Sequence, residues 1–149
     1  MQITRAAEYA IRGVLYLCSQ PQGSVCLLSE ISEHQQIPPS FLSKIFQGLA
    51  RAGIVSSTRG TGGGFTLVKD PDEITLLDVL EAIEGQIALN VCLLNGNSCD
   101  NRPTCAVHEV WHEAQDCLIE LLKRRSFAEL AEANRRNREA AAREPQPSD

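Results

Sequence analysis

The stretch PPSFLSKIFQGLARAGIVSSTRGTGGGFTLV, residues 38–68, decides the fold of this chain. Its first half predicts a helix that Pro39 or Ser40 opens and Gly53 ends. One face of that helix carries the apolar residues Leu42, Ile45, Phe46 and Leu49. Its second half predicts two strands, 54–58 and 65–68, joined by the turn Arg59-Gly60-Thr61-Gly62-Gly63-Gly64. The stretch therefore predicts a helix followed by a β-hairpin.

A second short helix is expected just upstream, over residues 27–36, with Leu28 and Ile31 facing inward. Two short helices around a tight break form a helix-turn-helix, and a hairpin after them makes a winged helix. Before these elements, Thr4 can cap a first helix whose apolar pattern stops near Pro21. We therefore expect a mainly α fold with a small β-hairpin wing.

The polar residues of this stretch suggest a surface for DNA. Ser40, Ser43, Lys44 and Gln47 fall opposite the apolar face of the helix that Pro39 or Ser40 opens, where they could reach base edges in a major groove. Arg59 at the base of a wing, and Gly60, Thr61 and Gly62 in its glycine-rich tip, would contact phosphates or a minor groove. The alternative is a plain solvated face. A nucleotide-binding loop is excluded because strands flank the glycines and no Lys-Ser/Thr follows them.

The charge distribution supports the DNA interpretation although the total charge does not. The 149 residues carry a net charge of −5, yet residues 38–69 contain Lys44, Arg51, Arg59 and Lys69 and no acid. Chance in a short window is the alternative. Apolar residues make up 43%, which suffices for a core, and no apolar run reaches the ~20 residues of a membrane span. With no signal peptide at Met1, we expect a cytoplasmic protein without membrane contact.

The second half of the chain predicts a pairing surface. Thr75 and Asp78 form a capping box for a helix that Gly85 stops. A long helix from Thr104 to about Arg125 carries the apolar stripe Val107, Val110, Trp111, Ala114, Leu118, Leu121 and Leu122. Such a stripe suits a homodimer, although packing against the chain's own domain is the alternative. Ser126 and Glu129 cap a last helix. The expected division is a DNA-binding domain at 1–84, a loop at 85–104, dimerisation and C-terminal helices at 105–134, and a flexible tail at 135–149.

Three of the six cysteines lie within residues 92–108, as Cys92-x6-Cys99-x5-Cys105-x2-His108. Structural zinc prefers ligand pairs two to four residues apart, whereas these wider gaps favour an iron–sulfur cluster. Cys105 and His108 can face the same way at the start of the long helix. Zinc and a metal-free redox thiol pair remain alternatives. The other cysteines, Cys18, Cys26 and Cys117, are expected to be structural.

These motifs together resemble the Rrf-type winged-helix transcription regulators, which include the IscR-like and NsrR-like iron–sulfur repressors. The resemblance covers about residues 1–130. It rests on the three-cysteine loop and on four further motifs: Arg5-x-x-Glu8-Tyr9-Ala10, Pro39-Ser40-Phe41-Leu42, Leu49-x-x-Ala52-Gly53-Ile54-Val55 and Arg59-Gly60-Thr61-Gly62-Gly63-Gly64-Phe65.

The resemblance implies a homodimer that binds a roughly palindromic operator and whose DNA affinity follows the state of the cluster. A Cys-x-x-His element, matched by Cys105 and His108, implies a 2Fe-2S cluster held by Cys92, Cys99, Cys105 and His108. A 4Fe-4S cluster is the alternative, with Glu8 of the partner chain as fourth ligand. The chain departs from the IscR-like pattern in its six-residue first gap and in Ser43, which replaces an acid. Both departures leave the cluster type and the operator open.

We therefore predict a cluster-sensing transcription regulator, a repressor, rather than an enzyme. The alternative is a winged-helix DNA-binding or interaction protein that binds zinc or no metal. An enzyme is disfavoured because His34, His108 and His112 have no nucleophile or paired carboxylate beside them in the sequence.

Overall fold

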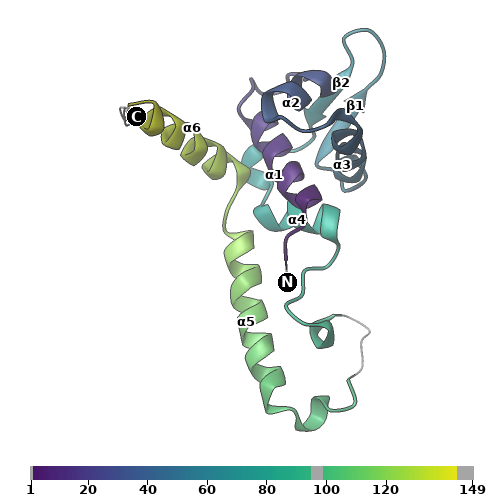
Figure 1. Cartoon of the computed structure of the whole chain (residues 1–149), viewed down its shortest axis with the longest axis vertical. Coiled ribbons are helices and arrows are strands. Elements are labelled where there is room, and N and C mark those ends of the chain that lie inside the picture. Colours follow the sequence, from purple (N-terminus) through teal and green to yellow (C-terminus); the bar gives the residue numbers. More distant parts are fainter. Residues whose placement is uncertain (1, 95–98, 144–149) are drawn as a thin grey trace, which may run out of the picture.

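The computed structural model describes residues 2–94 and 99–143 of the chain. Figure 1 shows a body at the top, an arm formed by α5, and a last helix, α6, that starts at the body and extends outward to the left. In chain order the elements are α1 (Arg5–Cys18), α2 (Leu28–Gln35), α3 (Pro39–Arg51), β1 (Val55–Thr58), β2 (Gly64–Leu67), η1 (Pro71–Glu73), α4 (Leu76–Glu84), η2 (Val91–Leu93), η3 (Arg102–Thr104), α5 (Ala106–Lys123) and α6 (Phe127–Arg143). The predicted class, mainly α with a two-stranded wing, is confirmed.

The helix-turn-helix consists of α2 and α3. The turn between them is tied down locally, because the Ile37 N–H donates to the Ser32 carbonyl at 3.0 Å and the Ser32 hydroxyl donates to the Ile37 carbonyl at 2.6 Å. Pro39 occupies the first turn of α3, where its missing N–H costs nothing. All four predicted apolar residues of α3 are buried, namely Leu42, Ile45, Phe46 and Leu49.

The wing is an antiparallel hairpin in which Val55 pairs with Leu67 and Thr58 pairs with Gly64. The segment before α2 pairs with β2 through a single antiparallel bridge. Cys26 and Phe65 exchange both backbone hydrogen bonds, at 2.9 and 2.8 Å. The wing is thereby attached to the start of the helix-turn-helix, which fixes its direction relative to α3.

The core of the body lies between α1, α2, α3 and the wing, and α6 completes it. Phe127, the first residue of α6, is fully buried in the same cluster as Phe46 and Val14. Its N–H also donates to the Ile74 carbonyl at 2.8 Å. The sequence placed the C-terminal helix in the same range as the dimerisation helix, and the structure shows that the start of α6 is part of the core of the body.

The predicted helix caps are confirmed. The Thr4 hydroxyl accepts from the Ala7 N–H at 3.3 Å, and Thr75 and Asp78 form the full capping box. Ser126 and Glu129 bond to each other's N–H groups, both at 3.3 Å.

The predicted end of the last helix, near residue 134, is wrong, because α6 continues to Arg143. Arg135 explains the extension, since its guanidinium pairs with Glu132 at 2.7 Å and with Glu139 at 2.5 Å along one face of the helix. Residues 144–149 of the expected tail lie outside the described residues.

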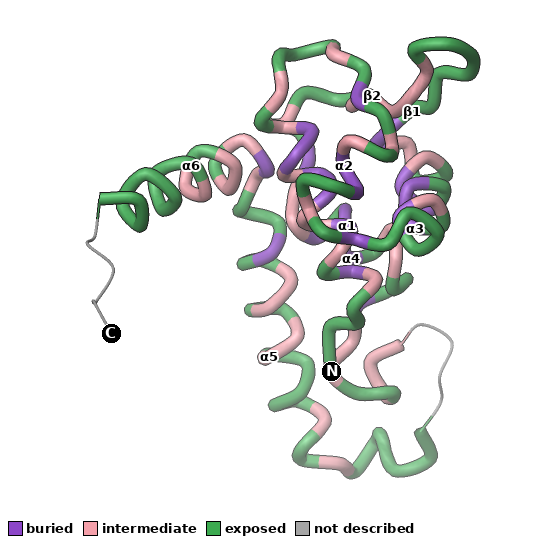
Figure 2. The backbone as a smooth tube through the Cα atoms, turned by 45° about the horizontal axis from the view of Figure 1, so that its top comes forward, coloured by how far each residue is buried: buried purple, intermediate pink, exposed green. Residues whose placement is uncertain are grey.

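Most of the apolar stripe of the arm helix α5 is exposed to solvent. Val107, Val110 and Leu121 are 54%, 61% and 47% exposed, and within the described part of the chain only Leu122 of this helix is buried. Figure 2 shows the same change along the arm, from exposed and intermediate residues to a buried one where α5 reaches the body. Cys117, expected to be structural, is exposed, so it adds nothing to the core of this chain.

Candidate functional site

The outward face of α3 presents the predicted DNA-reading residues. Ser40, Lys44 and Gln47 are exposed, and Ser43 is half-buried between them. They stand opposite Leu42 and the other buried residues of α3, which anchor the helix on the body. A helix held on one side and polar on the other is the form that enters a major groove.

Phe41 was missed as a candidate from the sequence. Its side chain is 60% exposed, although it is aromatic and lies in the first turn of α3. The available signal was its register, because Phe41 falls outside the apolar spacing of residues 42, 45, 46 and 49. An exposed aromatic at this position can contact a thymine methyl group.

The tip of the wing exposes Arg59, Gly60, Thr61 and Gly62. Gly60 and Gly62 have φ of +97° and +77°, which side chains disfavour, and the Gly63 N–H closes the turn on the Gly60 carbonyl at 2.9 Å. A Cβ on Gly64 would collide with the carbonyl of Cys26. The glycines therefore shape the tip and allow the wing to pack against the backbone of Cys26. Arg59 supplies the positive charge of the tip.

All four predicted cluster ligands line one cavity of about 450 Å³ at the far end of the arm. Cys92 belongs to η2, Cys99 precedes η3, Cys105 caps α5 and His108 lies in its first turn. The thiol of Cys99 is exposed, and those of Cys92 and Cys105 are half-buried. Among the described residues, however, no three histidine, cysteine or carboxylate side chains are close enough together to hold a metal ion. The fold thus places the four predicted ligands around one cavity, but their side chains do not converge on a common position within it.

The imidazole of His108 fits a role as ligand. Its Nδ1 is buried and has no hydrogen-bond partner among the described residues, which is unfavourable unless something binds there. His112, one turn further on, differs because its Nδ1 lies 3.1 Å from a carboxylate oxygen of Asp116. A soft thiolate set with one imidazole suits an iron–sulfur cluster. The donor set and the unpartnered nitrogen therefore fit such a group.

The further residues that line this cavity include Trp111 and Arg102, and the sequence did not single out either of them for it. Trp111, the only tryptophan in the chain, lies on α5 one turn after His108. Arg102 of η3 brings a positive charge beside the three thiols. The signal for Trp111 was present, because positions three apart on a helix share a face. The sequence carried no such signal for Arg102, because its position depends on how the irregular loop folds.

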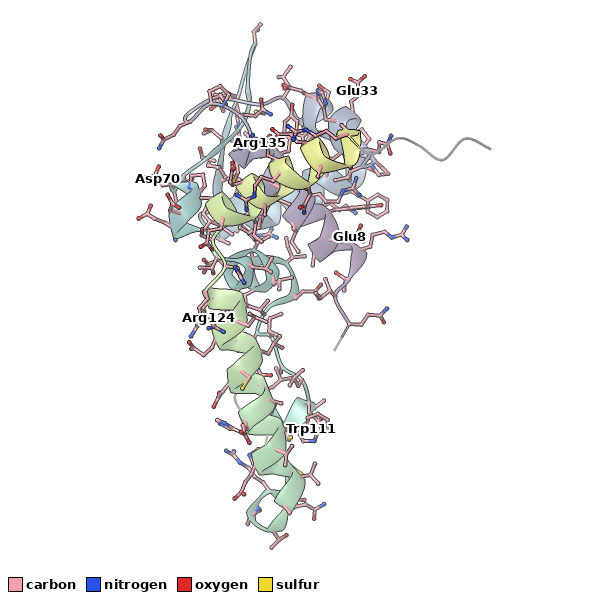
Figure 3. All side chains as sticks on the ribbon, turned by 90° about the vertical axis from the view of Figure 1, so that its left-hand side faces the viewer. Glu8, Glu33, Asp70, Trp111, Arg124 and Arg135 are labelled. Carbon is pink, nitrogen blue, oxygen red and sulfur yellow. The ribbon has the colours of Figure 1, made fainter. Side chains whose placement is uncertain are left out.

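Glu8 does not reach this cavity within its own chain. It lies exposed on α1, 3.8 Å from the guanidinium of Arg12. Figure 3 shows Glu8 on the body and Trp111 far along the arm. A carboxylate ligand from Glu8 would have to come from a second chain, and that remains a prediction.

The two cysteines of the body, Cys18 and Cys26, have thiols of low reactivity. Burial raises the pKa of the Cys18 thiol to about 12, and burial also raises the pKa of Cys26. Both thiols therefore stay protonated near neutral pH and are poor ligands and nucleophiles. Cys26 is buried in the core and Cys18 packs against it, as predicted.

No helix within the described ranges has both the length and the apolarity needed to cross a membrane.

Comparison with known proteins identifies the family. A family model described as an iron-dependent transcriptional regulator, Rrf2, matches residues 3–133. The HTH-type transcriptional regulator IscR of Photorhabdus laumondii is 32% identical over 130 residues, covering 87% of this chain and 79% of the relative.

Two solved structures are similar to this fold. The first is CymR, the global cysteine regulator of B. subtilis, with a TM-score of 0.74 and 26% identity over 89% of this chain and 98% of that one. The second is IscR of T. potens, with a TM-score of 0.70 and 20% identity over 98% and 93%. These relatives are regulators and not enzymes, as the sequence predicted. The chain belongs to the Rrf2 family of winged-helix transcriptional regulators.

Proposed function

We propose that this chain is an iron–sulfur-sensing repressor that binds a palindromic operator as a homodimer. The observation that carries the proposal is the unpartnered Nδ1 of His108, which is buried at a cavity lined by three cysteines. A buried imidazole nitrogen without a hydrogen bond is destabilising in the free chain, and a bound ligand removes that cost. The description of the family model, an iron-dependent transcriptional regulator, supports an iron-containing cofactor.

Cys92, Cys99, Cys105 and His108 would hold the cluster, with 2Fe-2S as the preferred form. When bound, the cluster supplies a redox-active centre that oxidants, nitric oxide or iron supply can alter. The amino end of α5, which Cys105 caps, favours the negative charge of thiolate ligands. A 4Fe-4S cluster with Glu8 of a second chain is the alternative within this proposal.

The exposed face of α5 supports the homodimer. Val107, Val110 and Leu121 are about half exposed, and burying the exposed part of each side chain contributes about 1 kcal/mol. A second copy of the same helix covers such a stripe symmetrically. Two α3 helices related by a two-fold axis then match two half-sites of a palindrome.

The position of the cavity supports control of DNA binding by the cluster. Cys105 caps the helix that would pair the two chains, and His108 lies in its first turn. Ligand binding there biases the arrangement of the arm, and a coupling of about 1–3 kcal/mol changes DNA affinity about 5- to 150-fold. We place this activity in the cytoplasm, where operator DNA is accessible.

The test begins with anaerobic purification, followed by absorption and Mössbauer spectra and by iron and sulfide analysis. We expect a coloured protein with about two iron atoms per chain. His108→Ala should alter the spectrum, whereas His112→Ala, on the same helix but paired with Asp116, should not. If Glu8→Ala alters the spectrum and His108→Ala does not, the 4Fe-4S alternative replaces the preferred form.

DNA affinity decides the sensing part of the proposal. Loaded and cluster-free protein are titrated against a labelled operator fragment, with the triple variant Cys92→Ala, Cys99→Ala, Cys105→Ala as reference. The proposal predicts different affinities for the loaded protein and the triple variant. Equal affinities would rule out a cluster-controlled switch.

A regulator with zinc or no metal is the second candidate. Its metal-free form is favoured by the absence of three converging donors in the described part of the chain and by the similarity to CymR, a cysteine regulator by name. A colourless protein that contains zinc or no metal after anaerobic purification would select this candidate.

A further inference from the structure

Gln115 joins the arm to the segment that leads into the cysteine cavity. It lies on α5 seven residues, two helical turns, after His108 and therefore on the same face of the helix. Its side-chain oxygen accepts from the Leu89 N–H at 2.9 Å, and its side-chain nitrogen donates to the Ile87 carbonyl at 2.6 Å. One amide thus satisfies a backbone donor and a backbone acceptor in a chain segment that has no regular structure.

The two ends of that segment belong to different parts of the molecule. The Ile87 side chain is 5% exposed and packs with Ala7 of α1 and Leu80 of α4 in the body. Leu89, in contrast, is followed at once by Asn90, whose side chain caps η2 by accepting from the Val91 N–H at 2.7 Å. Cys92 is the middle residue of η2. Gln115 therefore holds together the arm, the body and the short helix that carries the first cysteine.

From Ile87 the contacts continue to the recognition helix. α1 and α4, which hold Ile87, both pack on α3. The fit is close, because a Cβ on Gly48 of α3 would lie 3.3 Å from the Ile83 side chain of α4. A shift at Ile87 is therefore passed to α3 through packed side chains, which do not deform freely.

We infer that Gln115 is the positioning residue that transmits the state of the cysteine cavity to the winged-helix body. The inference rests on the proposed function, because it names how that sensor reaches DNA. With the double hydrogen bond intact, η2 and the body are fixed to the same point of α5. With it broken, Cys92 can move without moving Ile87.

The contact of Gln115 with Leu89 and Ile87, called the joint below, is tested in cluster-free protein, so the result does not depend on iron. Gln115→Met keeps the side-chain length and the helix propensity but removes both hydrogen bonds. At about 1 kcal/mol per hydrogen bond, the segment should open about 30-fold more often. Hydrogen exchange at the Leu89 amide and alkylation of Cys92, followed by peptide mass spectrometry, should rise accordingly.

Two further variants separate the joint from a general loss of stability. Gln115→Glu keeps the acceptor for the Leu89 N–H but sets a carboxylate oxygen against the Ile87 carbonyl, so both rates should rise in this variant as well. Glu113→Met, at an exposed position of the same helix, should leave both rates at the wild-type level. If Gln115→Met also leaves them there, the joint does not exist and the inference is overturned, whatever the iron content.

The transmitting role is tested in loaded protein. The ratio of DNA affinities between loaded and cluster-free forms should fall toward one in Gln115→Met and keep its wild-type value in Glu113→Met. If exchange and alkylation rise while the ratio is unchanged, Gln115 is only structural. If the wild type itself holds no cluster or shows no ratio, the proposed function fails and the transmission fails with it, while the exchange data still report on the joint.

Discussion

Replacing Gly13 by alanine tests the packing that seats the recognition helix on α1. A Cβ at this position would lie 2.7 Å from Cε2 and 3.1 Å from Cζ of Phe46. Phe46 is fully buried and meets Phe65 of the wing edge-on, with ring centroids 4.8 Å apart. The ring therefore has little room to swing away, and α3 or the wing must shift.

The expected size follows from two opposing effects. Overpacking a core costs about 1–3 kcal/mol. Alanine is favoured over glycine inside a helix by about 1 kcal/mol. Gly13→Ala should therefore lower the free energy of unfolding by about 1 kcal/mol and the Tm by about 3 °C.

A double-mutant cycle makes the prediction sharp. Phe46→Leu removes the ring atoms that a new Cβ would meet, so only the helix-propensity gain should remain when Gly13→Ala is added. The same substitution should thus destabilise the wild type and stabilise the Phe46→Leu background by about 1 kcal/mol in urea unfolding. An effect of equal sign and size in the two backgrounds would refute the close contact between α1 and α3.

Three other predictions concern the wing, the last helix and the alkaline limit of stability. Arg59→Ala should make the plot of log affinity against log salt less steep by about 2, if each chain of a homodimer loses one phosphate contact; an unchanged slope would remove Arg59 from the interface. Ser126→Ala removes the cap that accepts from the Glu129 N–H and should cost about 1 kcal/mol in urea unfolding without changing the m-value. Burial raises the pKa of Cys18 from 9.0 to about 12, so unfolding favours release of its proton above pH 9. Stability should therefore fall between pH 9 and 12 in the wild type and fall less in Cys18→Ala, as measured by the urea midpoint at each pH.

The fold of the DNA-binding half was predictable because its signals are local. Apolar spacing identified the buried face of α3, and Thr75 with Asp78 identified the start of α4. The glycine run identified the wing, since strands and turns of this length are encoded by adjacent residues. What the sequence missed depended on contacts between distant residues. Phe127 is in the body because its N–H and ring meet Ile74 and the core cluster, and no spacing rule connects positions so far apart.

The sequence predicted which residues form the candidate site, but not how they are arranged. The cysteine spacing identified Cys92, Cys99 and Cys105, and all three do line one cavity with His108. The separation of the ligands, the place of Arg102 and the double hydrogen bond of Gln115 depend on how an irregular segment folds against α5. Irregular segments have no periodicity from which such contacts could be deduced.

The late position of Phe127 has a consequence for synthesis. The body's core contains a side chain from beyond the arm, and the backbone bridge between Thr75 and Ser126 forms at the same place. On the ribosome, where a chain grows at about 5–20 residues per second, the winged helix is therefore made well before its core can close. A nascent or prematurely terminated chain that lacks Phe127 presents α3 and the wing on an incomplete core. The winged-helix body can therefore complete its core only after the cysteine segment and the arm have been translated. A fully folded DNA-binding body does not exist before its cysteine segment has been made.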